Sequence, residues 1–165
     1  MKLHELLENN AHTELDNIEI TSITDDTRKI KDGSLFVCVK GGSFDGHSAA
    51  AQMLEKGAAV VIAEHDLGLG SRQIIVDDSR EFYGKLCAKW FDHPEKKLKL
   101  IGITGTNGKT TITSVIKHIL TENGHKCGLI GTIQNEIGDE IIHTDNTTPM
   151  AYDLMMLFDK MVKAG

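Results

Sequence analysis

The sequence has 165 residues, with 18 lysines and arginines against 24 aspartates and glutamates, so its formal net charge is −6. A hydrophobic content of 40% and a charged content of 25% exclude a disordered or fibrous chain, and the length allows one domain or two small ones. The acidic balance excludes the broad positive surface that nucleic acids or anionic membranes require, while leaving room for one local anion site. We therefore expect neither a nucleic acid nor a membrane as a partner.

No apolar run approaches the roughly 18 residues of a membrane span, and charges interrupt the first ten residues, where a signal peptide has an apolar stretch. We therefore expect a cytoplasmic protein. Cys38, Cys87 and Cys127 are odd in number, far apart and set among apolar residues, so we expect buried thiols rather than disulfides or a metal site. The eight histidines show no tight ligand spacing, so zinc is not indicated.

The first part of the chain alternates predicted helices and strands. A short amphipathic helix comes first, and apolar runs bounded by polar turns then mark four strands. A glycine-rich loop at 41–46 leads into a second helix, and Ser79 is a suitable N-cap for a third. The predicted helices are 1–8, 47–56 and 79–91, and the predicted strands are 18–24, 34–39, 59–63 and 73–76.

A proline within a charged stretch, residues 92–97, interrupts this alternation and marks the predicted domain boundary. Beyond it we expect a βαβ unit with a parallel sheet. A hairpin near residue 138 and a final helix capped by Thr148, with Pro149 in its first turn, complete the prediction. The βαβ unit consists of a strand at 98–104, a helix at 109–122 and a strand at 127–133.

The predicted fold class is therefore α/β. A small α/β domain at 1–97 is followed by the start of a phosphate-loop, parallel-sheet domain at 98–165. Because a nucleotide-binding domain normally contains more strands than one βαβ unit and a hairpin supply, we expect this second domain to be incomplete.

The strongest chemical signal is a glycine-rich loop between the predicted strand at 98–104 and the predicted helix at 109–122. Glycines let backbone N–H groups converge on phosphate oxygens, and the helix N-terminus adds a favourable dipole. Lys109 can reach the β- and γ-phosphates of ATP, and the Thr110 hydroxyl can ligate Mg²⁺. A plain strand-to-helix turn is the alternative. The predicted ATP-binding residues are Gly105, Thr106, Asn107, Gly108, Lys109, Thr110 and Thr111.

This loop departs from the generic GxxxxGK[ST] pattern, because Ile103 stands where that pattern has its first glycine. The shorter sequence GTNGKTT resembles the ATP loop of the Mur ligases, the amide-forming enzymes of peptidoglycan precursor synthesis, and that of their relative folylpolyglutamate synthetase. Further motifs resemble, in the same order, the Mur ligases that add the third peptide residue, the UDP-N-acetylmuramoyl-tripeptide synthetases. They lie at residues 26–28, 32–37, 45–47, 100–104, 128–132 and 146–149.

The resemblance implies an ATP-dependent ligase that joins L-lysine or meso-diaminopimelate to UDP-N-acetylmuramoyl-L-alanyl-D-glutamate through an acyl phosphate. Lys109 is then the catalytic residue that stabilises the transferred phosphoryl group, and Thr110 is the metal-positioning residue. Thr27 stands where the family more usually has serine, which preserves a hydroxyl for the nucleotide. The implied uridine contacts are Thr27, Gly42, Ser43 and Phe44, and the implied muramoyl-dipeptide contacts are Asn146, Thr147 and Thr148.

Taken alone, the segments that carry these contacts have plainer interpretations: a turn at 25–28, a connection at 41–46 and a helix cap at 146–149. The resemblance covers about the first third of such an enzyme, so we expect an amino-terminal fragment that is monomeric and inactive by itself. The first alternative is another member of the superfamily, either the D-alanyl-D-alanine-adding ligase or folylpolyglutamate synthetase. The second is a UDP-sugar-binding module without catalysis.

Overall fold

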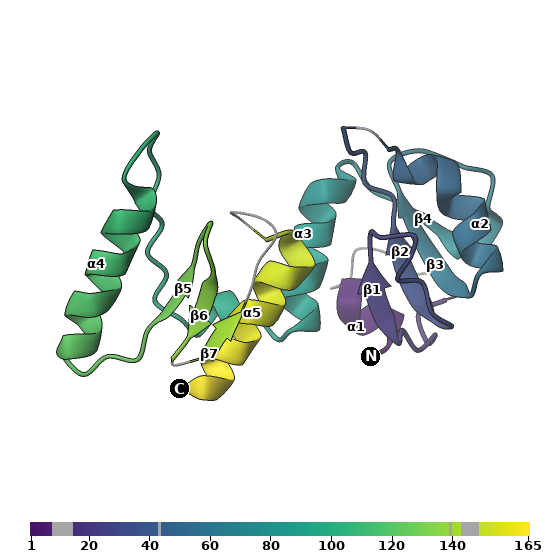
Figure 1. Ribbon diagram of the computed structural model, residues 1–165. Coiled ribbons are helices and arrows are strands. Elements are labelled where there is room, and N and C mark those ends of the chain that lie inside the picture. Colours follow the sequence, from purple (N-terminus) through teal and green to yellow (C-terminus); the bar gives the residue numbers. More distant parts are fainter. Residues whose placement is uncertain (8–14, 43, 139, 143–148) are drawn as a thin grey trace. The chain divides into compact units, whose positions relative to one another are not determined.

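The computed structural model of the chain describes residues 1–7, 15–42, 44–138, 140–142 and 149–165 (Figure 1). These residues form two compact units, Met1–Trp90 and Phe91–Gly165, each with its own sheet. The division between the units falls next to the charged, proline-containing stretch at 92–97. Helices combined with a parallel sheet confirm the predicted α/β fold class.

The first unit is built on a parallel sheet of four strands in the order β1-β2-β3-β4. Every residue of β2 is buried, and so is every residue of β3 except Ala59. Such continuous burial is typical of central strands that are covered on both faces. The strands are β1 Ser22–Thr24, β2 Ser34–Val37, β3 Ala58–Ala63 and β4 Gln73–Ile75.

Helices cover both faces of this sheet, with α2 on one side and α1 and α3 on the other (Figure 1). Phe36 and Val61 pack with Met53 of α2 in one buried apolar cluster. Because side chains alternate across a strand, Leu35 and Ile62 fill the opposite face. The helices are α1 Leu3–Leu7, α2 Ala50–Glu55 and α3 Ser79–Trp90, with 3-10 helices η1 Gly46–Ala49 and η2 Gly70–Arg72.

The second unit combines two long helices with an antiparallel sheet in the order β5-β6-β7. Helix α5 packs on β6 and η3, and its Tyr152 meets Phe91 edge-on at a ring-centroid distance of 5.2 Å. No helix in the described parts of either unit is long and apolar enough to cross a membrane. The elements are η3 Pro94–Lys96, α4 Lys109–Glu122, β5 Gly128–Ile130, β6 Asn135–Ile137, β7 Glu140–Ile142 and α5 Ala151–Ala164.

Three sequence predictions for the second unit are wrong. Residues 98–104 form no strand, and β5 pairs with β6 in antiparallel rather than with a preceding parallel strand. A segment rich in apolar residues, such as 98–104, needs hydrogen-bonded neighbours to form a strand, and no described residue pairs with it, so Leu100 and Ile101 remain 53% and 61% exposed. The N-cap of α5 is Met150 rather than Thr148, so Pro149 precedes the helix.

The cysteines follow the expectation of buried thiols in two cases out of three. Cys38 and Cys87 are buried thiols that form no disulfide with a described residue, whereas Cys127 is partly exposed. Burial raises the pKa of the Cys38 thiol to about 12, so this group stays protonated and unreactive at neutral pH.

Candidate functional site

The loop that precedes α4 has a backbone geometry suited to phosphate. Gly105 and Gly108 have φ angles of +151° and +78°, a region that glycine adopts without a steric penalty. Gly108 is the N-cap of α4, and its carbonyl accepts a hydrogen bond from the Ile112 N–H at 2.9 Å. Residues 105–108 are all exposed. The first N–H groups of a helix have no partner within it, so this exposed N-terminus can donate to an anion.

Lys109 extends back over this loop. Its Nζ donates to the Gly105 carbonyl at 2.5 Å, which places the ammonium beside the first residue of the loop. The hydroxyl of Thr113 bonds the carbonyls of Lys109 and Thr110, both at 2.9 Å, and this fixes the first turn. The segment 105–111 therefore combines the Lys109 ammonium, exposed threonines and backbone N–H donors within seven residues.

The same segment could bind Mg²⁺ together with a phosphate-containing ligand. The described residues contain no group of three or more histidine, cysteine, aspartate or glutamate side chains that could hold a metal by themselves. Mg²⁺ is commonly held through substrate phosphates, one or two protein oxygens and several waters. Thr110, exposed in the first turn of α4, supplies an oxygen of that kind.

A second candidate site lies at the carboxyl edge of the parallel sheet in the first unit. The turn at 25–28 follows β1 and the loop at 41–46 follows β2. Because β1 and β2 are parallel neighbours, both segments leave the sheet at the same edge. Ligands of open α/β sheets bind at this edge. Phe44 is 51% exposed there, so its ring is accessible to a planar ligand such as a base.

The turn after β1 is held by its own side chains. Asp26 accepts from the Arg28 backbone N–H at 2.9 Å, and its two carboxylate oxygens accept from Nε and Nη2 of Arg28 at 2.9 and 2.8 Å. These bonds lower the pKa of Asp26 to about 2. Thr27 lies between the two partners in the sequence and is only partly buried.

Asp26 is expected to titrate with a midpoint near pH 2, well below the ordinary value of 3.8. Because the folded-state pKa is depressed, the contact with Arg28 stabilises the fold above about pH 4 and loses this effect as the pH falls toward 2. A carbon-detected NMR titration of the carboxyl group measures this midpoint. Arg28→Gln should raise it toward 3.8, and a wild-type midpoint already near 3.8 would rule out the ion pair in solution.

The loop after β2 is closed by backbone contacts. The Gly41 N–H donates to the Phe44 carbonyl at 2.8 Å, and Lys40 pairs with Asp45 in an antiparallel bridge. Gly46 donates to the Val39 carbonyl at 3.1 Å where the chain returns to the end of β2. A Cβ on Gly46 would lie 3.0 Å from both the Cys38 Cα and the Val39 nitrogen, so the close approach requires glycine.

Gly46→Ala is therefore expected to lower the free energy of unfolding by about 1–3 kcal/mol, because backbone atoms cannot move aside as a side chain can. Gly42→Ala is the matched control in the same loop. A Cβ at Gly42 meets nothing within 4 Å, so its effect should stay within about 0.5 kcal/mol. Urea unfolding of both variants measures the difference, and equal stabilities would contradict the close approach at Gly46.

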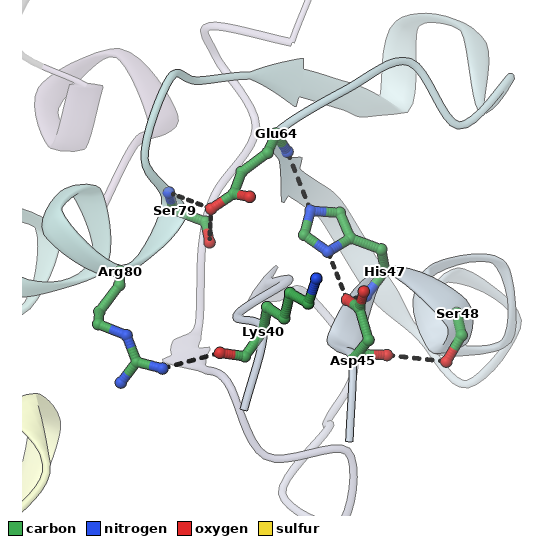
Figure 2. Close-up of polar contacts among 7 residues, drawn as sticks. All are labelled: Lys40, Asp45, His47, Ser48, Glu64, Ser79 and Arg80. Carbon is green, nitrogen blue, oxygen red and sulfur yellow. Dashed lines mark hydrogen bonds and ion pairs between the residues drawn. The ribbon is translucent and has the colours of Figure 1, made fainter. Parts of the chain in front are cut away.

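A polar cluster lies behind this loop (Figure 2). The His47 ring bonds Asp45 through Nδ1 at 2.6 Å and accepts the Glu64 backbone N–H at Nε2 at 3.0 Å. The Glu64 carboxylate accepts from the N–H and hydroxyl of Ser79 at 3.0 and 2.8 Å. Arg80 donates to the Lys40 carbonyl at 2.8 Å. The cluster thereby joins the segments that follow β2, β3 and β4.

Sequence reasoning noted the motif at 45–47 but gave its members no role, named Ser79 only as a helix cap, and missed Glu64 and Arg80. The parallel sheet brings these residues close together, and no local sequence pattern predicts this proximity. Among the predicted contact residues, Thr27, Gly42 and Phe44 lie at the sheet edge of the first unit, and 105–111 lies in the second. The predicted Ser43, Asn146, Thr147 and Thr148 lie outside the described residues.

Comparison with known protein families assigns both units. Residues 19–90 match the Mur ligase family catalytic domain, and residues 103–165 match the Mur ligase middle domain. The chain belongs to the Mur ligase family. The resemblance drawn from the phosphate loop and its companion motifs is thereby confirmed at the level of the family.

Individual Mur ligases match along the whole chain. The UDP-N-acetylmuramoyl-L-alanyl-D-glutamate–2,6-diaminopimelate ligase of Bacillus cereus is 45% identical over 168 residues, covering 100% of this chain and 34% of that enzyme. The enzyme of the same name from Clostridioides difficile is 41% identical, with 100% and 35% covered. The chain thus spans about a third of the length of the curated relatives it matches.

Solved structures show the same fold. A structure of a UDP-N-acetylmuramoyl-L-alanyl-D-glutamate–2,6-diaminopimelate ligase superimposes with a TM-score of 0.79 at 23% identity, covering 100% of this chain and 34% of the other. The D-alanyl-D-alanyl ligase of Acinetobacter baumannii that acts on UDP-N-acetylmuramoylalanyl-D-glutamyl-2,6-diaminopimelate gives a TM-score of 0.60 at 27% identity, with 96% and 33% covered. The arrangement of elements is therefore that of Mur ligases.

Proposed function

We propose that the chain supplies the nucleotide-substrate-binding and phosphate-binding parts of an ATP-dependent ligase of peptidoglycan precursor synthesis. The reaction joins a third amino acid to UDP-N-acetylmuramoyl-L-alanyl-D-glutamate. The observation that carries the proposal is the loop at 105–111, with Gly108 at the N-terminus of α4 and Lys109 extended over the loop. The names of relatives that are 41–45% identical support the substrate and favour 2,6-diaminopimelate over L-lysine as the added residue.

The chemistry assigned to the second unit is phosphoryl transfer from ATP to the glutamyl carboxylate, followed by attack of the amine and loss of phosphate. Backbone N–H groups of Gly105–Gly108 and of the first turn of α4 bind the phosphate oxygens. Lys109 leaves the Gly105 carbonyl, 2.5 Å away, and stabilises negative charge on the transferred phosphoryl group. Thr106, Asn107 and Thr111 complete the contacts to ATP. Positioning and charge, rather than a general base, lower the barrier.

Thr110 is the residue that would hold Mg²⁺, through its exposed hydroxyl. The chemistry that Mg²⁺ would supply at this position is neutralisation of negative charge on the ATP phosphates.

The first unit binds the uridine part of the UDP-muramoyl dipeptide in this account. Thr27, Gly42 and Phe44 face the uridine part from the carboxyl edge of the sheet, together with Ser43. The segment with Asn146, Thr147 and Thr148 contacts the muramoyl dipeptide. We assign 1–97 as the UDP-sugar-binding domain and 98–165 as the first part of the central ATP-binding domain. The protein is expected to act in the cytoplasm as a monomer.

Titration calorimetry of the chain with three ligands tests this assignment. UDP-N-acetylmuramoyl-L-alanyl-D-glutamate should bind more tightly than the UDP-muramoyl tripeptide, which is the substrate of the D-alanyl-D-alanine-adding ligase, or than dihydropteroate. Tighter binding of the tripeptide or the pterin would move the assignment to one of those superfamily members. Binding of the dipeptide by a full-length protein that releases no phosphate from ATP would indicate a binding module without catalysis.

A further inference from the structure

His47 has no role in the chemistry above, yet its ring is fixed on every side. The residue is 9% exposed, and its ring stacks on that of His65 at a centroid distance of 4.8 Å and an interplanar angle of 20°. One ring nitrogen bonds the Asp45 carboxylate and the other the Glu64 backbone N–H (Figure 2). A buried ring with both nitrogens satisfied holds two segments of chain in a fixed relation.

These two bonds define the state of the ring. Because a backbone N–H only donates, Nε2 must accept from Glu64 and carries no proton. The proton is therefore on Nδ1, which donates to the Asp45 carboxylate at 2.6 Å. The same carboxylate oxygen accepts the His47 backbone N–H at 3.0 Å, and both bonds keep the pKa of Asp45 below its usual range. Neutral His47 thus anchors an ionised Asp45.

Asp45 lies next to the end of the loop at 41–46, which follows β2. Its backbone pairs with Lys40 at the start of the loop, and the Lys40 carbonyl accepts from Arg80 of α3. On the other side of the ring, Glu64 follows β3 and binds the N-terminus of α3 through Ser79. His47 is therefore the connection between the two ends of the loop and the rigid sheet behind it.

We propose that His47 is a positioning residue, which holds the loop at 41–46 in the conformation that receives the nucleotide part of the substrate. The inference rests on the proposed function for the identity of that ligand, but not for the anchoring itself. His47 touches no substrate in this account and acts only through Asp45.

Two near-isosteric substitutions test the bond to Asp45 and the bond to Glu64 one at a time. His47→Asn keeps an amide at the place of Nδ1 and can still donate to Asp45, whereas His47→Gln keeps an acceptor only near the place of Nε2. His47→Ala keeps neither. His65→Ala is the matched control, because it removes the stacked ring while leaving both bonds of His47 in place. Thermal unfolding of each variant records the loss of packing, which His47→Asn and His47→Ala share.

Amide hydrogen exchange at Gly41 and Gly46 measures the anchoring without any ligand, since their N–H groups close the loop. Exchange should be at least tenfold faster in His47→Ala and His47→Gln than in wild type, and His47→Asn, which keeps the bond to Asp45 but not the one to Glu64, should restore part of the protection. Equal exchange in wild type and His47→Ala, or the same acceleration in His47→Asn as in His47→Ala at matched stability, would overturn the proposal.

The dissociation constant for UDP-N-acetylmuramoyl-L-alanyl-D-glutamate, measured by calorimetry on the same variants, tests the link to binding. It should rise at least tenfold in His47→Ala and His47→Gln, but stay within about threefold of wild type in His47→Asn and His65→Ala. If wild type binds the substrate and His47→Ala binds it with the same affinity, the positioning role is contradicted and the proposed function is not. Failure of wild type to bind would contradict the proposed function, while the exchange rates would still decide the anchoring.

Discussion

Replacement of Lys109 by alanine is expected to reduce ligation by roughly 10³-fold in a full-length ligase that carries this sequence, the scale of losing a group that stabilises transition-state charge. Affinity for the UDP-muramoyl dipeptide should stay within about twofold. The reason is that Lys109 lies in the second unit, beside the Gly105 carbonyl, whereas the turn at 25–28 and the loop at 41–46 belong to the first. Steady-state phosphate release and calorimetry with each substrate measure the two effects.

Lys163→Ala is the matched control for this experiment. Lys163 also lies on a helix of the second unit, is 73% exposed and pairs only with Asp159 of the same helix among its described ion pairs. Its loss removes one positive charge from the unit without touching the phosphate loop, so ligation should change less than twofold. Equal loss of ATP and UDP-substrate affinity in Lys109→Ala would show that the two sites are not separate.

Residues 1–165 expressed by themselves are expected to form no UDP-muramoyl tripeptide, even with ATP, Mg²⁺, the dipeptide substrate and diaminopimelate or lysine. The relatives extend about three times as far, so residues 1–165 correspond to about a third of such a ligase. Reaction requires the acyl phosphate and the amine to meet in a water-poor cleft. Losing that positioning removes roughly 7–11 kcal/mol of barrier lowering.

Mass spectrometry of the reaction mixture, with isotope-labelled amino acid, is the appropriate assay. The control is a full-length relative such as the Bacillus cereus ligase under the same conditions. Tripeptide formed by residues 1–165 faster than in an enzyme-free mixture would show that these residues carry more of the chemistry than the account allows.

The elements with strong local signals could be predicted from the sequence. The predicted helix at 109–122 has the bounds of α4, because a glycine precedes a regular apolar repeat there. The central strands β2 and β3 were predictable because continuous aliphatic runs between polar turns fit only strands buried on both faces. The strand predicted at 18–24 begins four residues before β1, Ser22–Thr24. Apolar and polar residues alternate from residue 18, but pairing with β2 begins only at Ser22.

The remaining features depend on contacts between distant segments. The run at 98–104 has the composition of a strand, but composition does not provide a hydrogen-bonded neighbour. The polar cluster around His47 joins residues 17 and 15 positions apart through single bonds, which no periodicity reveals. Sequence reasoning therefore found the loops that carry the candidate contacts, and it missed the side chains that hold one of them in place.

Amide chemical-shift mapping of the isotope-labelled chain tests the central claim most directly, that two separate sites bind the two nucleotide substrates. UDP-N-acetylmuramoyl-L-alanyl-D-glutamate should shift resonances at 25–28 and 41–46, and ATP with Mg²⁺ should shift those at 105–111. The two sets should not overlap, and each ligand should leave the other set unchanged. Shifts from both ligands in one set, or no shift at 25–28 and 41–46 with a saturating concentration of the UDP substrate, would contradict the account.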